Sequence, residues 1–88
     1  MSETNWTATW LRSARITDDL AGDVIANMRS DLNVPPMFHI SEMRSYLRVK
    51  GASIEALTAV PILWQRYSNW LAQTRRRAEA RKAGQEGV

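Results

Sequence analysis

Residues 41–71 decide the fold class, and they read SEMRSYLRVKGASIEALTAVPILWQRYSNWL. Gly51 follows a helical pattern, and glycine is a common residue just past a helix end. Ser53 can cap a new helix, because its side-chain oxygen can accept from free backbone N–H groups. Pro61 costs about 3 kcal/mol inside a helix but is tolerated in a first turn, so we expect it to begin the last helix. A kinked continuous helix from Ser53 is the alternative.

Two more helices are expected ahead of this stretch. The first spans about Asn5 to Ser13 and places Trp6 and Trp10 on one face, since they are four residues apart. The second starts after Thr17 and ends near Ser30. Its first turn is expected to hold Asp18 and Asp19, where the helix dipole favours carboxylates. Gly22 lies inside it, which suggests close approach of another helix.

Residues 31–39 are expected to form the main loop, because Pro35 and Pro36 restrict the backbone there. The apolar residues Met37, Phe38 and Ile40 predict that the loop folds back onto the core. Ser41 is expected to cap the third helix.

The final helix carries the large core side chains. Helical spacing directs Leu63, Trp64, Tyr67, Trp70 and Leu71 inward, with Trp64 and Tyr67 largely buried. The short helix before it should direct Ile54, Leu57 and Val60 inward. The alternative for Trp64, Tyr67 and Trp70 is a base-stacking platform. Trp70 could lie at the edge of the apolar stripe, about 60° from Trp64 around the helix, and Trp6 is close to the N-terminus. We treat both as candidate partner-binding residues, because tryptophan is common at interface hot spots.

Length and composition indicate one small domain of 88 residues. The sequence has no cysteine, which excludes disulfides, thiolate metal sites and a cysteine nucleophile. No apolar run approaches the ~20 residues of a membrane span. The first ten residues also lack the order of a signal peptide, so we expect a cytoplasmic location.

Charge divides the chain into a body and a tail. Residues 1–74 carry seven basic and seven acidic side chains, whereas residues 75–88 carry five basic and two acidic ones. We therefore predict a helical bundle over 1–74 and a basic extension over 75–88. The extension should project or fray, end as a helix at Gly84, and be disordered beyond it.

The extension has three interpretations. Its five basic residues could bind nucleic-acid phosphates, an acidic protein surface, or only solvent. A second basic edge is expected on the third helix. The candidate basic residues are Arg75, Arg76, Arg77, Arg81 and Lys82 in the extension and Arg44, Arg48 and Lys50 in the third helix.

Catalysis and metal binding are not predicted. His39 is the only histidine, and a lone histidine without cysteines does not make a metal site. Asp18, Asp19 and Asp23 cluster at a helix start but lack the ligand pattern of a calcium loop. We therefore expect no catalytic residue, cofactor or metal.

The order of these signals resembles the YozE-type family of small bacterial proteins, whose fold is similar to that of sterile alpha motif (SAM) domains. The resemblance covers about residues 6–71. It departs at Val34-Pro35-Pro36, where an aromatic residue before proline is expected, and at Pro61. The residues that carry it are Trp6, Trp10 and Leu11, then Asp18, Asp19 and Gly22, Asp31 and Pro35, Tyr46-Leu47 and Gly51-Ala52, and Trp64 and Tyr67.

The resemblance implies a five-helix, SAM-like orthogonal bundle and no reaction. We expect a non-enzymatic protein-interaction module, a small adaptor or regulator. It could be a phage- or plasmid-type accessory protein that binds or inhibits a host factor. The alternative is a nucleic-acid-binding protein that uses the basic tail and the Arg44, Arg48 and Lys50 edge.

Overall fold

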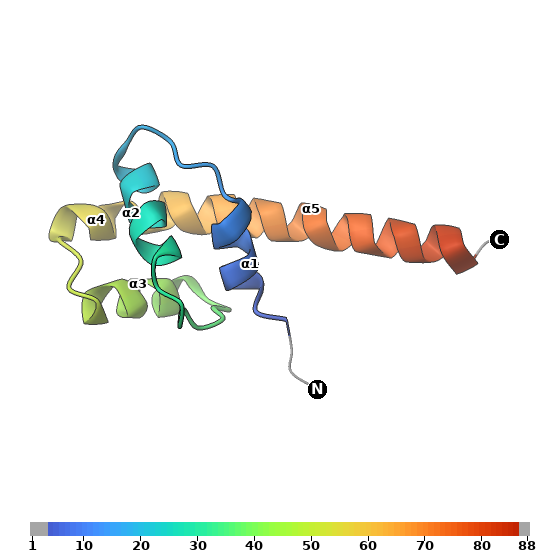
Figure 1. Ribbon diagram of the computed structural model, residues 1–88, viewed down its shortest axis with the longest axis horizontal. Coiled ribbons are helices and arrows are strands. Elements are labelled where there is room, and N and C mark those ends of the chain that lie inside the picture. The colour runs from blue at the N-terminus through green and yellow to red at the C-terminus, as the bar shows by residue number, and fades with distance from the viewer. Residues whose placement is uncertain (1–3, 87–88) are drawn as a thin grey trace.

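The computed structural model describes the backbone of residues 4–86 and the side chains of residues 4–78, and all of its regular structure is helical (Figure 1). An all-α bundle was predicted, and this is confirmed. The helices are α1 (Trp6–Ser13), α2 (Leu20–Arg29), α3 (Ile40–Val49), α4 (Ile54–Thr58) and α5 (Val60–Glu86).

Three predicted helix boundaries are confirmed by their capping contacts. The Asn5 side chain accepts from the Ala8 N–H and so begins α1, and Ser53 does the same for α4 through the Ala56 N–H. Gly51 follows α3 with a φ of 80°, a left-handed conformation that suits glycine. Pro61 lies in the first turn of α5, and α4 ends before it, at Thr58. The alternative of one kinked helix is therefore wrong.

Two predicted helix starts are wrong by one or two residues. Asp19 caps α2 from outside, because its carboxylate accepts from the Gly22 N–H over 2.8 Å. It therefore does not lie in the first turn. The α3 helix begins at Ile40, so Ser41 is inside the helix and does not cap it. Glu42 reaches back to the Phe38 N–H over 3.2 Å, which supports the earlier start.

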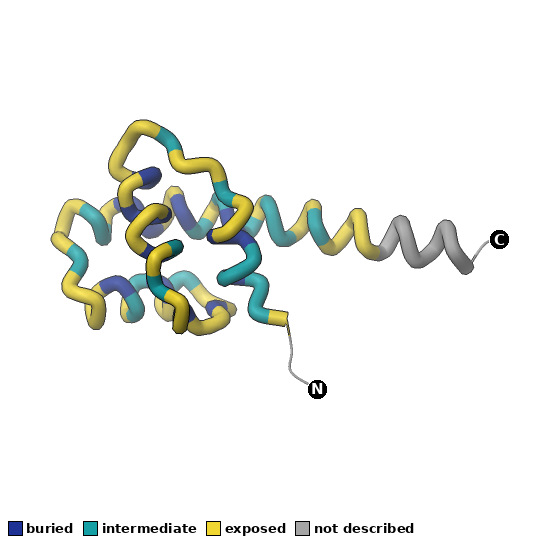
Figure 2. The backbone as a smooth tube through the Cα atoms, viewed as in Figure 1, coloured by how far each residue is buried: buried dark blue, intermediate teal, exposed yellow. Residues whose placement is uncertain are grey.

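The core surrounds the first half of α5, which packs against all four other helices. Figure 2 shows that buried residues gather where α1, α2 and α3 meet this half of α5. Leu63 and Val60 of α5 are fully buried, and Leu57 packs against the core as expected. The main members of the core are Trp10, Leu11, Val24, Ile25, Met28, Met37, Met43, Leu47, Val60, Leu63 and Tyr67.

Several side chains expected in the core are not buried there. Phe38 is 67% exposed and Ile54 is 82% exposed. Trp64 is partly buried and packs against the core, and Tyr67 is buried as predicted. Ile54 is the first residue of the five-residue α4, so it lies at the edge of the bundle. The exposure of Phe38 results from the contacts that hold the loop before α3.

We expected Gly22 to allow another helix to approach, but the atoms nearest to it belong to Thr17, just before α2. A Cβ atom at this position would lie 1.7 Å from the carbonyl oxygen of Thr17. The chain just before α2 therefore passes against the helix, and the three atoms nearest to the added Cβ all belong to Thr17. This contact explains why glycine occupies a helical position where it otherwise costs about 1 kcal/mol relative to alanine.

The second half of α5 extends beyond the bundle, as Figure 1 shows. A helix of 27 residues is about 40 Å long, which accounts for most of the 52 Å length of the molecule. The helix continues through Gly84 to Glu86, so the predicted end at Gly84 is wrong. The disorder expected for residues 87 and 88 lies outside the described residues. Within the described part of the chain, no helix is long and apolar enough to cross a membrane.

Candidate interaction groove

Three tryptophan rings surround Tyr67 of α5, and a fourth, Trp6, meets one of the three. The Tyr67 ring lies 5.3 Å from that of Trp10 and 5.4 Å from that of Trp64, measured between ring centroids. Trp70 stacks on Tyr67 at 6.3 Å and meets the edge of Trp6 at 6.2 Å. Such pairs add about 0.5–1.5 kcal/mol beyond their burial. The cluster fixes α1 against α5 and explains the regular spacing of the aromatic residues in the sequence.

The loop before α3 is fixed to this cluster through Thr7. Thr7 is fully buried in α1, and its hydroxyl accepts from the Met37 N–H over 2.9 Å. The same hydroxyl donates to the Tyr67 hydroxyl over 3.3 Å. Met37 is thereby held in the core, whereas the next residue, Phe38, is exposed. The exposure of Phe38 is thus imposed by the fold.

A groove with a volume of about 410 Å³ opens beside this loop, where α5 leaves the bundle. We call it the α5 groove. Its walls come from three parts of the chain: Trp6 of α1, Pro36 and Phe38 of the loop, and Trp64, Leu71 and Arg75 of α5. Arg75 is the one charged residue among the described residues that line it. The α5 groove is therefore aromatic along its walls and cationic at the end nearest the projecting helix.

The predicted partner-binding residues fall into separate places. Trp6 lines the α5 groove, whereas Trp70 is half-buried between Trp6 and a smaller hollow beside Arg15 and Arg66. Arg75 joins Trp6 at the groove. Arg76 and Arg77 are exposed further along α5. Arg81 and Lys82 belong to α5, but their side chains are not among those that the structure describes.

The expected basic edge of α3 is divided. Arg44 is half-buried and Arg48 is exposed, but Lys50 pairs with the Asp31 carboxylate at 3.3 Å. Arg48 and Lys50 are two residues apart, so they are separated by about 200° around the helix axis. Only Arg44 and Arg48 share a face.

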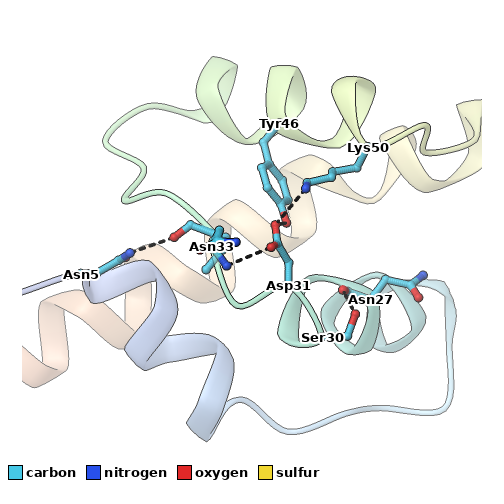
Figure 3. A network of polar contacts seen from close by, with 8 residues as sticks. Asn5, Asn27, Ser30, Asp31, Asn33, Tyr46 and Lys50 are labelled. Carbon is cyan, nitrogen blue, oxygen red and sulfur yellow. Dashed lines mark hydrogen bonds and ion pairs between the residues drawn. The ribbon is translucent and has the colours of Figure 1, made fainter.

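A polar cluster closes the other end of the bundle (Figure 3). Asp31 accepts from the Tyr46 hydroxyl over 2.6 Å and from the Asn33 N–H over 2.9 Å, and it pairs with Lys50. The Tyr46 bond, then the Asn33 bond, hold the pKa of Asp31 below its ordinary value. Burial, and next the bond to Asp31, raise the pKa of Tyr46 far above its usual range. These contacts join the end of α2 to α3 beside a hollow of about 630 Å³.

The residues considered for metal binding do not form a ligand set in the described part of the chain. His39 is exposed at the start of α3. The Thr17 hydroxyl donates to Asp19 over 2.5 Å, and this bond and the one from the Gly22 N–H lower the pKa of Asp19. Asp19 therefore acts as a helix cap.

Sequence reasoning missed Phe38, Pro36 and Trp64 as surface residues of the groove. The signal available was the Pro35-Pro36 pair, which makes the loop stiff and extended. Of the adjacent residues Met37 and Phe38, one is buried and the other is exposed. Which one it is depends on Thr7, thirty residues away in the sequence.

Comparison with protein-family models, with curated protein sequences and with solved structures found no match in any of the three. The resemblance to YozE-type proteins is therefore not supported by a family match.

Proposed function

We propose that this protein is a non-enzymatic interaction module that binds another protein through the α5 groove. The observation that carries the proposal is the exposed ring of Phe38 on the rim of a groove that Trp6 and Trp64 also line. Aromatic residues are enriched at the cores of protein interfaces, and tryptophan is among the commonest residues at hot spots. The volume of the groove, about 410 Å³, is within the range of sites that hold a peptide anchor or a small molecule.

The rigidity of the rim supports the same function. The Met37 N–H is bound by Thr7 and the Phe38 N–H by Glu42, so the backbone on which the Phe38 ring stands is held at two successive residues. A preformed surface loses less conformational entropy on binding, which leaves more of the contact energy for affinity. A small adaptor or regulator needs only such a surface and no reacting groups.

Nucleic-acid binding is the second candidate, favoured by one observation. Arg75, Arg76 and Arg77 are exposed and consecutive where α5 leaves the bundle. They can neutralise phosphates, but residues 1–74 have no net charge and so offer little to hold a duplex in register. We therefore place protein binding first.

A pull-down separates the two candidates: the full chain is immobilised and exposed to lysate with and without nuclease treatment. We expect the wild-type chain to retain a protein that the Phe38→Ala variant does not retain. Retention should fall less steeply with salt than the binding of a nucleic acid would, because much of the contact is apolar. Loss of all bound material on nuclease treatment, or equal retention by both variants, would contradict the proposal.

A further inference from the structure

The α5 groove and the projecting half of α5 meet at Arg75, and one occupant can use both. Leu71 and Arg75 are four residues apart and both line the groove, so the cationic group lies about one helical turn, ~5.4 Å, beyond the apolar wall. From Arg75 onward the chain carries five basic residues and one acidic residue up to Lys82. The apolar surface ends where the positive charge begins.

The other charges around the groove do not cancel this arrangement. Glu42 keeps its negative charge near the Phe38 end of the rim, where its carboxylate accepts from the Phe38 N–H, but it does not line the groove. Arg76 and Arg77 are exposed beyond the groove. No acidic residue is among the described residues that line it. The charge that complements this surface is negative.

We propose that the α5 groove takes an acidic segment of a partner protein, with one large apolar anchor against Trp6, Phe38 and Trp64 and a carboxylate on the guanidinium of Arg75. This inference rests on the proposed function and adds the chemistry of the partner. The distance along α5 sets the spacing in the segment. Anchor and carboxylate are three or four residues apart if the segment is helical, or two apart if it is extended.

A nucleic acid uses this surface less completely. Its phosphates would pair with Arg75, Arg76 and Arg77, but the apolar walls at Trp6 and Leu71 would stay in contact with water. An acidic peptide covers the apolar walls and pairs with the arginines at the same time.

The test is selection from a phage-displayed library of random peptides against the immobilised full chain. We expect the selected peptides to combine Trp, Phe or Leu with Asp or Glu at the spacing above. As synthetic peptides, they should bind Phe38→Ala and Arg75→Glu about tenfold or more weakly than wild type. Peptides whose Asp or Glu is replaced by Lys should recover binding to Arg75→Glu.

Arg12→Glu is the matched control for net charge, since Arg12 is exposed on α1 and does not line the groove. It should bind like wild type, and thermal melting should show that all variants fold. Peptides that need Phe38 but not an acidic residue would overturn this inference and leave the proposed function intact. If no selected peptide depends on Phe38, both fail. Binding of mixed-sequence duplex DNA that depends on Arg75, together with no such peptide, would also overturn both.

Discussion

The hydroxyl groups of Thr7 and Tyr67 lie 3.3 Å apart in the core, sixty residues apart in the sequence. Thr7 also accepts the Met37 N–H, so one buried hydroxyl joins α1, α5 and the loop before α3. The position of Phe38 on the rim of the α5 groove depends on this junction. A protein with a small core thus uses a polar contact to determine which of two neighbouring apolar side chains faces the surface.

Replacing Thr7 with valine should destabilise the fold, although the new side chain has nearly the same shape. The Met37 N–H would lose its partner in a buried place, at a cost of about 1–3 kcal/mol. For a domain of this size each kcal/mol lowers Tm by about 4–8 °C. Thr7→Ser is the control, because it keeps the hydroxyl. Equal melting of Thr7→Val and wild type would show that the hydrogen bond does not hold the loop.

Gly22→Ala should also destabilise the protein, against the usual effect of alanine in a helix. Alanine gains about 1 kcal/mol in helix propensity. The added Cβ, however, would lie 1.7 Å from the Thr17 carbonyl oxygen, so the backbone before α2 must move. Chemical denaturation measures the difference. Ala26→Gly, at an exposed position in the same helix, gives the size of the propensity effect alone. A Gly22→Ala protein more stable than wild type would contradict the close approach.

The polar cluster at Asp31 should make stability depend on pH in the acid range. The pKa of Asp31 is lowered in the folded chain, chiefly by the Tyr46 hydroxyl, so the stabilisation is complete above the unfolded pKa, about 3.9. It is lost as the pH falls through the folded pKa. Asp31→Asn should therefore lose less stability than wild type between neutral and acid pH. Part of the dependence should remain, because the pKa of Asp19 is lowered too.

Denaturation midpoints at a series of pH values give this comparison. Tyr46→Phe removes the hydroxyl and should resemble Asp31→Asn in its weaker acid dependence. Parallel curves for wild type and both variants would show that the Asp31–Tyr46 bond does not contribute to the stability of the fold.

Removal of the projecting half of α5 should leave the bundle folded. The apolar residues that pack on the core end at Leu71, and the described side chains from Gln73 to Ala78 are polar or small. A chain truncated after Thr74 should therefore melt within about 4–8 °C of the full chain, the shift for about 1 kcal/mol in a domain of this size. Circular dichroism during heating measures this. A truncated chain without a cooperative transition would show that residues 75–88 belong to the folded unit.

The same segment tests the nucleic-acid alternative in the full chain. If α5 binds duplex DNA, replacing Arg75, Arg76 and Arg77 with alanine removes about three phosphate contacts. The log–log salt slope should then become less steep by about 0.9 for each contact. We expect instead that wild type and variant bind duplex DNA with similarly low affinity. A large difference between them would favour the alternative.

The sequence was sufficient for features that depend on neighbouring residues. Gly51 ends α3, Ser53 caps α4 and Pro61 begins α5 because each acts through its own backbone or the next turn. The predicted start of α3 was wrong because it assumed a Ser41 cap. In the structure Glu42 reaches back to the Phe38 N–H, and the helix begins at Ile40. Gly22 was assigned to a helix contact because the path of the chain at Thr17 is not local information.

The α5 groove could not be predicted because its walls come from three distant segments. Phe38 and Trp64 both looked like core residues from hydrophobicity and spacing. The exposure of Phe38 follows from Thr7 and Tyr67, which hold Met37 inward, whereas Trp64 is only partly covered by the core. Arg75 was recognised as basic, but its place beside Trp6 and Leu71 appears only once α5 is packed.

The central claim is that the α5 groove is the binding face, and an NMR titration tests it most directly. The isotope-labelled full chain is titrated with the unlabelled protein that wild type retains and Phe38→Ala does not. We predict that the indole N–H signals of Trp6 and Trp64 and the amide signal of Phe38 shift. The amides of Lys50 and Gly51, at the Asp31 cluster, should stay unchanged. Shifts confined to the Asp31 cluster, or absent from Trp6, Phe38 and Trp64, would contradict the account.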